Sequence, residues 1–170
     1  MKKLVIIFFL IISAKSFSQE HSLFINSTTK LITFERIYKI DTLKADFIFD
    51  KAKNWFIHHF AAADNVIKEE NKPTIIKGVF KTSYMSSTGE EHLYYNDIEV
   101  TIKYGAIKLR VTNFKHIGMR SLSPLEEMGT TTDGSIKNTR GQKQIFIDID
   151  KKCQKLSEEL LKNISSKTEW

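Results

Sequence analysis

The sequence predicts an α+β fold in which an antiparallel sheet of about five strands carries two helices on one face, in the chain order β-α-β-β-β-β-α. Apolar residues alternate with a period of two over several stretches between residues 31 and 117, as in strands with one buried face. The period changes to about 3.6 over residues 45–60 and 142–165, as in amphipathic helices. Two such helices need a shared sheet face on which to bury their apolar stripes, which predicts one layer of helices on one layer of sheet.

The first strand is predicted over residues 31–40 and the first helix over residues 45–60. Apolar side chains at Ile32, Phe34, Tyr38 and Ile40 share one side of the strand, which Arg36 interrupts. In the helix, Ile48, Ala52, Trp55 and Phe56 form one stripe. We expect Trp55 to anchor this helix on the sheet.

A short strand near residues 65–70, a turn at residues 71–73 and a longer strand over residues 74–85 follow. Gly78 removes a side chain from the more apolar face of the longer strand. A glycine inside a strand marks a bulge or the close approach of another element. At Gly78 we therefore expect either a bulge or the close approach of another element.

The stretch "NDIEVTIKYGAIKLRVTNF", residues 96–114, predicts a β-hairpin with a two-residue loop at Tyr104 and Gly105. This register pairs Ile102 with Ile107, Val100 with Leu109 and Ile98 with Val111 on the buried face. On the other face it pairs Thr101 with Lys108, Glu99 with Arg110, Asp97 with Thr112, Tyr95 with Phe114, and Leu93 with His116. The second face is therefore expected to be charged in its middle and apolar at its far end.

Residues 118–141 are rich in Gly, Ser and Thr and predict a long loop, with one helical turn beginning near Ser123. The final helix is predicted from Gln142 to Ser165, and Cys153 lies on its apolar stripe. A thiol at that position is expected to be buried and unreactive. Because Cys153 is the only cysteine, no internal disulfide is expected.

The first eighteen residues, "MKKLVIIFFLIISAKSFS", have two lysines, a short apolar run and small residues at the end, which is the order of a secretory signal peptide. We expect cleavage after Ser18, a flexible arm over residues 19–30, one domain over residues 31–165, and a tail over residues 166–170. The protein is then periplasmic or extracellular. Three of the lysines belong to the leader, so half of the net charge of +6 leaves with it, and nucleic-acid binding is not expected.

Residues that could carry chemistry are few. His58 and His59 are neighbours on a helix and point about 100 degrees apart, and the hairpin register places His92 and His116 on opposite faces of the sheet. We therefore expect no metal site, and no cofactor. The sequence contains no nucleophile elbow and no phosphate-binding glycine loop, so no catalytic residue is assigned.

The segments "FERIYKID", "KAKNWFIHHFAAADNVIKEE", "IIKGVFKTSY" and "YNDIEVTIKYGAIKLRVTNFKHIG" resemble a bacterial family of secreted proteins of unknown function that have a TATA-box-binding-protein-like (TBP-like) fold. The resemblance covers residues 31–118. It implies helices on one sheet face and an open second face. The family has no assigned activity, so the resemblance implies no catalytic residue, and its fold does not by itself imply DNA binding.

The best functional hypothesis is a secreted, non-enzymatic binding or accessory module, whose partner is an unknown protein or envelope component. Its partner would contact the sheet face opposite the helices around Leu93, Tyr95, Phe114 and Val79, because an exposed apolar patch is a candidate contact site. Two alternatives remain. One is an enzyme with a cleft between the 118–141 loop and the sheet, where His92, His116 or glutamates act as acids or bases. The other is a homodimer that uses the same sheet face as its interface.

Overall fold

The computed structural model of the chain describes residues 23–40, 43–60, 67–85, 89–103, 105–118, 122–129 and 140–166. The predicted signal peptide lies outside these residues, as do the predicted arm before residue 23 and all of the predicted tail after residue 166. The elements are β1 (Leu23–Ile25), β2 (Ile32–Lys39), α2 (Ala45–His59), β3 (Ile67–Asn71), β4 (Ile75–Met85), β5 (Glu91–Lys103), β6 (Ala106–Ile117), β7 (Leu122–Pro124), α4 (Leu125–Gly129) and α5 (Arg140–Ser165). Among the described residues no helix is both long and apolar enough to span a membrane.

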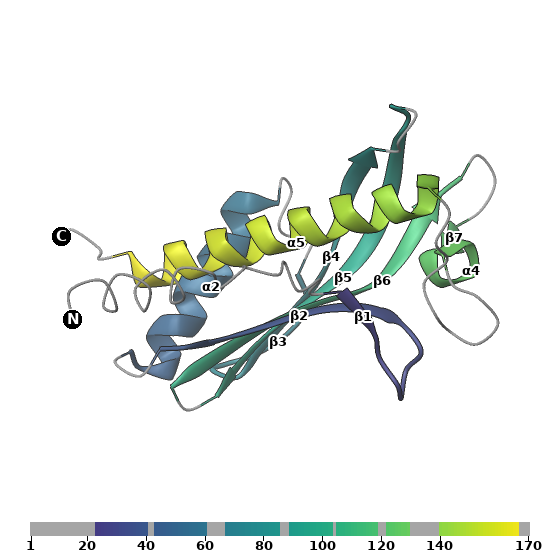
Figure 1. The fold of residues 1–170 in the computed structure, drawn as a ribbon. Coiled ribbons are helices and arrows are strands. Elements are labelled where there is room, and N and C mark those ends of the chain that lie inside the picture. Colours follow the sequence, from purple (N-terminus) through teal and green to yellow (C-terminus); the bar gives the residue numbers. More distant parts are fainter. Residues whose placement is uncertain are drawn as a thin grey trace, which may run out of the picture.

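The strands form one antiparallel sheet with the order β1-β2-β6-β5-β4-β3, and β7 pairs with β6 off this path. Helices α2 and α5 lie across the same face of this sheet (Figure 1). The predicted α+β architecture with two helices on one face is therefore confirmed. The sheet has two short strands more than the five that were expected.

Both additional strands lie in segments that were expected to be irregular. The expectation of a flexible arm is wrong for residues 23–30, because β1 pairs with β2 and places Leu23 opposite Phe34. The turn between them closes when the Asn26 side-chain oxygen accepts hydrogen bonds from the backbone N–H groups of Thr28 and Thr29. Within residues 118–141, β7 pairs with the end of β6, and α4 begins one or two residues after the predicted helical turn.

The core lies between the sheet and the two long helices. Trp55 of α2 is 4% exposed, which confirms its expected packing. On α5, the Cys153 side chain is also buried, as expected. The Tyr38 hydroxyl of β2 contacts the Ser157 hydroxyl of α5 at 2.8 Å, which links this strand to the helix that covers it. The fully buried apolar side chains come from β2, α2, β4, β5, β6 and α5, and include Phe34, Phe56, Ile76, Ile98, Leu109 and Ile149.

Gly78 lies beside a break in the strand register, which agrees with the first of the two alternatives expected for it. It pairs with Ile67 of β3, and the register between β3 and β4 shifts between Ile67 and Glu69. Beyond Gly78, β4 pairs only with β5 among the described residues.

The hairpin of β5 and β6 follows the predicted register from its turn as far as Asp97 and Thr112, and then departs from it. The next pair is Tyr95 with Lys115, so that one extra residue of β6 is inserted. Asn113 adopts the left-handed conformation there, with φ of 55°, and its Nδ2 donates a hydrogen bond to Asp97 Oδ2 at 2.8 Å. The predicted pairs Tyr95–Phe114 and Leu93–His116 are therefore wrong.

The bulge turns the rest of β6 over, because successive side chains of a strand point to opposite faces. Phe114 is consequently on the helix side, where its exposure is 0%. His116 is turned to the same side and contacts His92. The prediction that the two histidines lie on opposite faces of the sheet is wrong for the same reason.

Candidate functional site

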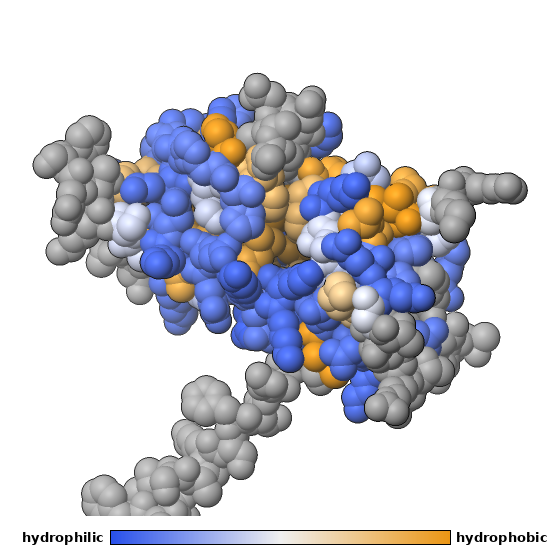
Figure 2. Space-filling model, turned by 90° about the horizontal axis from the view of Figure 1, so that it is seen from above, coloured by the Kyte–Doolittle hydropathy of each residue, from blue (hydrophilic) through white to orange (hydrophobic). Residues whose placement is uncertain are grey.

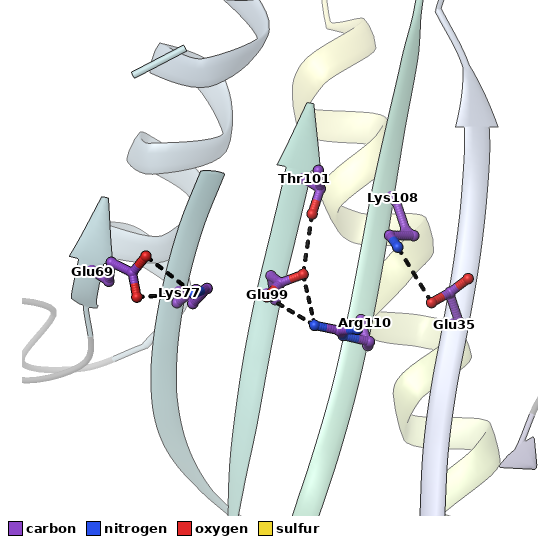
Figure 3. Close-up of polar contacts among 7 residues, drawn as sticks. All are labelled: Glu35, Glu69, Lys77, Glu99, Thr101, Lys108 and Arg110. Atoms are coloured by element: carbon purple, nitrogen blue, oxygen red, sulfur yellow. Dashed lines mark hydrogen bonds and ion pairs between the residues drawn. The ribbon is translucent and has the colours of Figure 1, made fainter. Parts of the chain in front are cut away.

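The candidate site is the sheet face opposite α2 and α5, which we call the open face. Figure 3 views the sheet from this side: the labelled side chains project from the strands toward the viewer, and α5 passes behind them. They come from five neighbouring strands, β3, β4, β5, β6 and β2.

A row of alternating charges crosses the middle of the open face. The register places Glu69, Lys77, Glu99, Arg110 and Glu35 directly beside one another on β3, β4, β5, β6 and β2. Lys77 Nζ lies 2.9 Å from Glu69 Oε2, and Arg110 Nη2 lies 2.9 Å from Glu99 Oε1 (Figure 3). The predicted Glu99–Arg110 pair is therefore confirmed.

Two further contacts complete this charged row. Lys108 Nζ approaches Glu35 Oε2 to 3.6 Å, and the Thr101 hydroxyl donates a hydrogen bond to Glu99 Oε1 at 3.1 Å (Figure 3). The hydrogen bond to Glu69 raises the pKa of Lys77. Exposed ion pairs contribute little to stability, but opposite charges across each strand pair favour this register over slipped ones. The acidic and basic side chains of the row therefore compensate one another, and none of these charges is left for a ligand.

A hollow of about 370 Å³ lies on the same face. Its lining includes Val79 and Asp97, which are opposite each other in the β4–β5 register, and Thr112 of β6. Val79 is half-buried. The hollow is thus lined mostly by polar and charged residues, and Val79, which the sequence predicted for the partner-binding face, lies in its wall.

An apolar patch lies at the end of the open face that is farthest from the hairpin turn. We call it the distal patch and define it by Leu93, Tyr95, Ile117 and Leu122. Tyr95 is 40% and Leu122 51% exposed, while Leu93 and Ile117 are half-buried. Extending the Tyr95–Lys115 register by two residues aligns Leu93 with Ile117, and Ile117 pairs with Leu122 of β7.

Two lysines border the distal patch. Lys81, Tyr95 and Lys115 are aligned across β4, β5 and β6. Among the described residues neither lysine has an ion-pair partner, in contrast to the lysines of the charged row. The distal patch therefore combines an apolar centre with two uncompensated positive charges.

Three of the four residues predicted for a partner-binding face lie on the open face, namely Leu93, Tyr95 and Val79. Phe114 does not, and Ile117 of β6 takes the place beside Leu93. Sequence reasoning missed Ile117 and Leu122 because the bulge at Asn113 was not recognised and β7 was read as loop. An asparagine within an alternating strand pattern, where it adopts the left-handed conformation more readily than most residues, was the available signal.

His92 and His116 form a second cluster, on the helix side. His92 Nδ1 lies 3.2 Å from His116 Nε2, and the His116 ring also packs against Tyr94, with ring centroids 5.2 Å apart. Burial, and then the nearby His92, lower the pKa of His116. Burial raises the pKa of Tyr94 to about 12, so its hydroxyl stays protonated at neutral pH.

The two histidines line a cavity of about 160 Å³ together with Tyr94, Leu125, Gln142, Ile145 and Phe146. The cavity lies between α4, the sheet and the beginning of α5, near the place predicted for a cleft in the enzyme alternative. Its wall is largely apolar. Among the described residues no group of three or more His, Cys, Asp or Glu side chains is placed to hold a metal ion.

A third concave region lies between the end of α2, β4 and α5, with a volume of about 350 Å³. Figure 2 shows hydrophobic residues within a hollow that hydrophilic residues flank, on the side of the molecule seen from above. His59 lines the cleft and lies 3.3 Å from Glu159, while Lys152 donates to the Ser83 carbonyl. Burial holds the pKa of Cys153, which also lines the cleft, far above its ordinary value, so this thiol is not a nucleophile at neutral pH.

Comparison with known proteins identifies the class of fold. A protein from Parabacteroides distasonis described as TBP-like superimposes with a TM-score of 0.66 at 9% identity, over 80% of this chain and 94% of that one. A DUF4468 family protein from Bacteroides ovatus superimposes with a TM-score of 0.64 at 14% identity, over 82% of this chain and 90% of that one. At these identities the likeness defines the fold, which is the TBP-like fold predicted from sequence.

A second comparison concerns the sequence of the central part of the chain. Residues 34–116 match the family model described as "Domain of unknown function (DUF4468) with TBP-like fold". This part of the chain is therefore similar to DUF4468 domains, which confirms the resemblance seen in the sequence. No curated protein matches the chain.

Proposed function

We propose that the protein is an exported, non-enzymatic binding module that docks a protein partner on the distal patch of its open face. The observation that carries the proposal is the row of Lys81, Tyr95 and Lys115, in which an exposed aromatic ring lies between two lysines without ion-pair partners among the described residues. Aromatic side chains with an apolar body and a polar tip are frequent anchors of protein interfaces.

The chemistry of the patch defines its partner. An apolar side chain of the partner would cover Leu93, Tyr95 and Ile117, and acidic residues around it would face Lys81 and Lys115. Complementary charge of this kind increases the association rate and the specificity more than the affinity. The predicted leader, residues 1–18, supports a partner in the periplasm or outside the cell.

In-cell photo-crosslinking tests the proposal. A photoreactive amino acid at Leu93 is expected to capture one reproducible foreign protein, identified by mass spectrometry. The same probe at Asn54, an exposed position on α2 and hence on the opposite side of the molecule, is the matched control. Charge reversal by Lys81→Glu together with Lys115→Glu should reduce the adduct at Leu93 about tenfold, because two favourable interactions become repulsive.

The outcomes separate the hypotheses. An adduct that depends on both lysines and is absent at Asn54 supports the binding module and identifies its partner. Capture of only a second copy of the chain would instead mean that the open face is a homodimer interface. Equal capture at Leu93 and Asn54, or an adduct that ignores the charge reversal, would reject the distal patch as a docking site.

A further inference from the structure

We propose that His92 and His116 form a binding site for a divalent transition-metal ion, with Zn²⁺ as the representative ion. The site lies on the helix side of the sheet and is separate from the distal patch, so it does not depend on the proposed docking function. It is built by the bulge at Asn113, which turns His116 to the face of the sheet that carries His92.

The distance between the two imidazoles carries the argument. His92 Nδ1 and His116 Nε2 face each other at 3.2 Å. Two nitrogen ligands of a tetrahedral zinc ion, each about 2.0–2.1 Å from the metal, lie about 3.3–3.4 Å apart. The two nitrogens thus have nearly the separation that a shared metal ion requires, and binding requires the rings to turn until both lone pairs point at the ion.

Without a metal, the two rings share a hydrogen bond. A neutral imidazole has one donor and one acceptor nitrogen, so the contact is satisfied only when one ring presents its N–H and the other its lone pair. A metal ion accepts lone pairs from both nitrogens at once, and imidazole is a preferred ligand of zinc, copper and nickel. The same two nitrogens that share a proton in the hydrogen bond can therefore share a cation instead.

The surroundings hold the two rings in place. Tyr94 pairs with His116 across β5 and β6, and the rings of the two histidines have centroids 5.2 Å apart. The adjoining cavity of about 160 Å³ provides space for further ligands of the metal. Tyr94 lines this cavity, and its buried hydroxyl has no hydrogen-bond partner among the described residues. A metal-bound water in the cavity is the kind of partner that this hydroxyl lacks.

Among the described residues, the protein supplies two ligands, His92 and His116. No third His, Cys, Asp or Glu of these residues lies close enough to complete a group of three. Sites with four protein ligands are closed and structural, whereas fewer ligands leave positions for water or another donor. We therefore infer an open, exchangeable site that binds more weakly than a structural zinc centre.

Zinc titration of the purified chain tests the site, followed by calorimetry and by NMR of the imidazole nitrogens. One equivalent of Zn²⁺ is expected to shift the signals of His92 Nδ1 and His116 Nε2. The substitutions His92→Gln and His116→Gln should each weaken zinc binding at least tenfold, because each removes half of the protein ligands. His58→Gln is the matched control, since this exposed helical histidine lies outside the pair and its loss should leave the affinity unchanged.

Two results would overturn the inference. One is that the signals of these two nitrogens do not move at one equivalent of zinc. The other is that both glutamine variants, folded by circular dichroism, bind zinc as tightly as the parent. If a variant does not fold, the nitrogen shifts in the parent chain decide the question by themselves.

Discussion

His116 has neighbours that oppose its protonation. It is partly buried, and the ring of His92 lies against it. Burial is the larger of the two causes that lower its pKa, and the electrostatic effect of the nearby His92 is the second. The folded protein therefore binds a proton at His116 less readily than the unfolded chain does.

This difference predicts how stability depends on pH. The unfolded chain takes up a proton near the ordinary histidine pKa of about 6.5, and the folded state takes it up only at lower pH. The stabilisation is fully present above pH 6.5 and is lost as the pH falls through the folded pKa. The free energy of unfolding of the parent, measured with urea at pH 7.5, 6.5 and 5.5 with a chelator present, should fall more steeply than that of His116→Gln. Parallel curves for the two proteins would contradict this prediction.

At the scale of elements, the bulge in β6 decides which side chains reach each face of the sheet. A single inserted residue moves Phe114 into the core and His116 against His92, and it brings Ile117 to the open face. Asn113 fits the bulge because asparagine tolerates the left-handed conformation, and its side chain is held by Asp97. The bulge therefore shapes both the distal patch and the histidine pair.

Substitutions at position 113 test this role. Asn113→Val places a β-branched side chain at φ of 55° and should cost more stability than Asn113→Gly, by about 1–2 kcal/mol, because both variants lose the hydrogen bond to Asp97 but only valine is strained. Urea unfolding of the two variants measures the difference. Equal stability would mean that β6 can pair with β5 without the left-handed residue.

At the scale of the whole molecule, the two faces of the sheet differ in burial. The helix side contributes the core, while the open face carries the charged row, Ile37 and the distal patch. Ile107 and Ile37 lie on neighbouring strands, β6 and β2, yet their exposures are 0% and 63%. The same chemical change at these two positions should therefore have very different consequences.

Truncation of each isoleucine to alanine measures this asymmetry. Ile107→Ala should lower the free energy of unfolding by about 2–5 kcal/mol, because it leaves a cavity under the helices. Ile37→Ala should change it by no more than about 0.5 kcal/mol, as is usual for surface positions. Chemical denaturation of the purified variants provides both values. A large loss at Ile37 would indicate that the open face is covered in solution, for example by a second copy of the chain.

The sequence by itself determined the class of fold and the locations of its main elements. The change from a period of two to a period of 3.6 predicted the first and last residues of α2 and α5 to within two residues of those observed. Matching apolar residues across the hairpin identified its register from Ile102 and Ile107 to Asp97 and Thr112. These features depend on the alternation of apolar and polar residues and on the burial of one face, and both can be read from the sequence.

Only the tertiary structure decided which residues meet at the far end of the hairpin. Strand periodicity cannot foresee an inserted residue, and each insertion exchanges the two faces beyond it. Strand β1 was also missed, because its three residues are too few to show a periodic pattern. These residues form a strand only because they pair with β2. The distal patch and the histidine pair therefore depend on the packing of the whole domain rather than on any motif in the sequence.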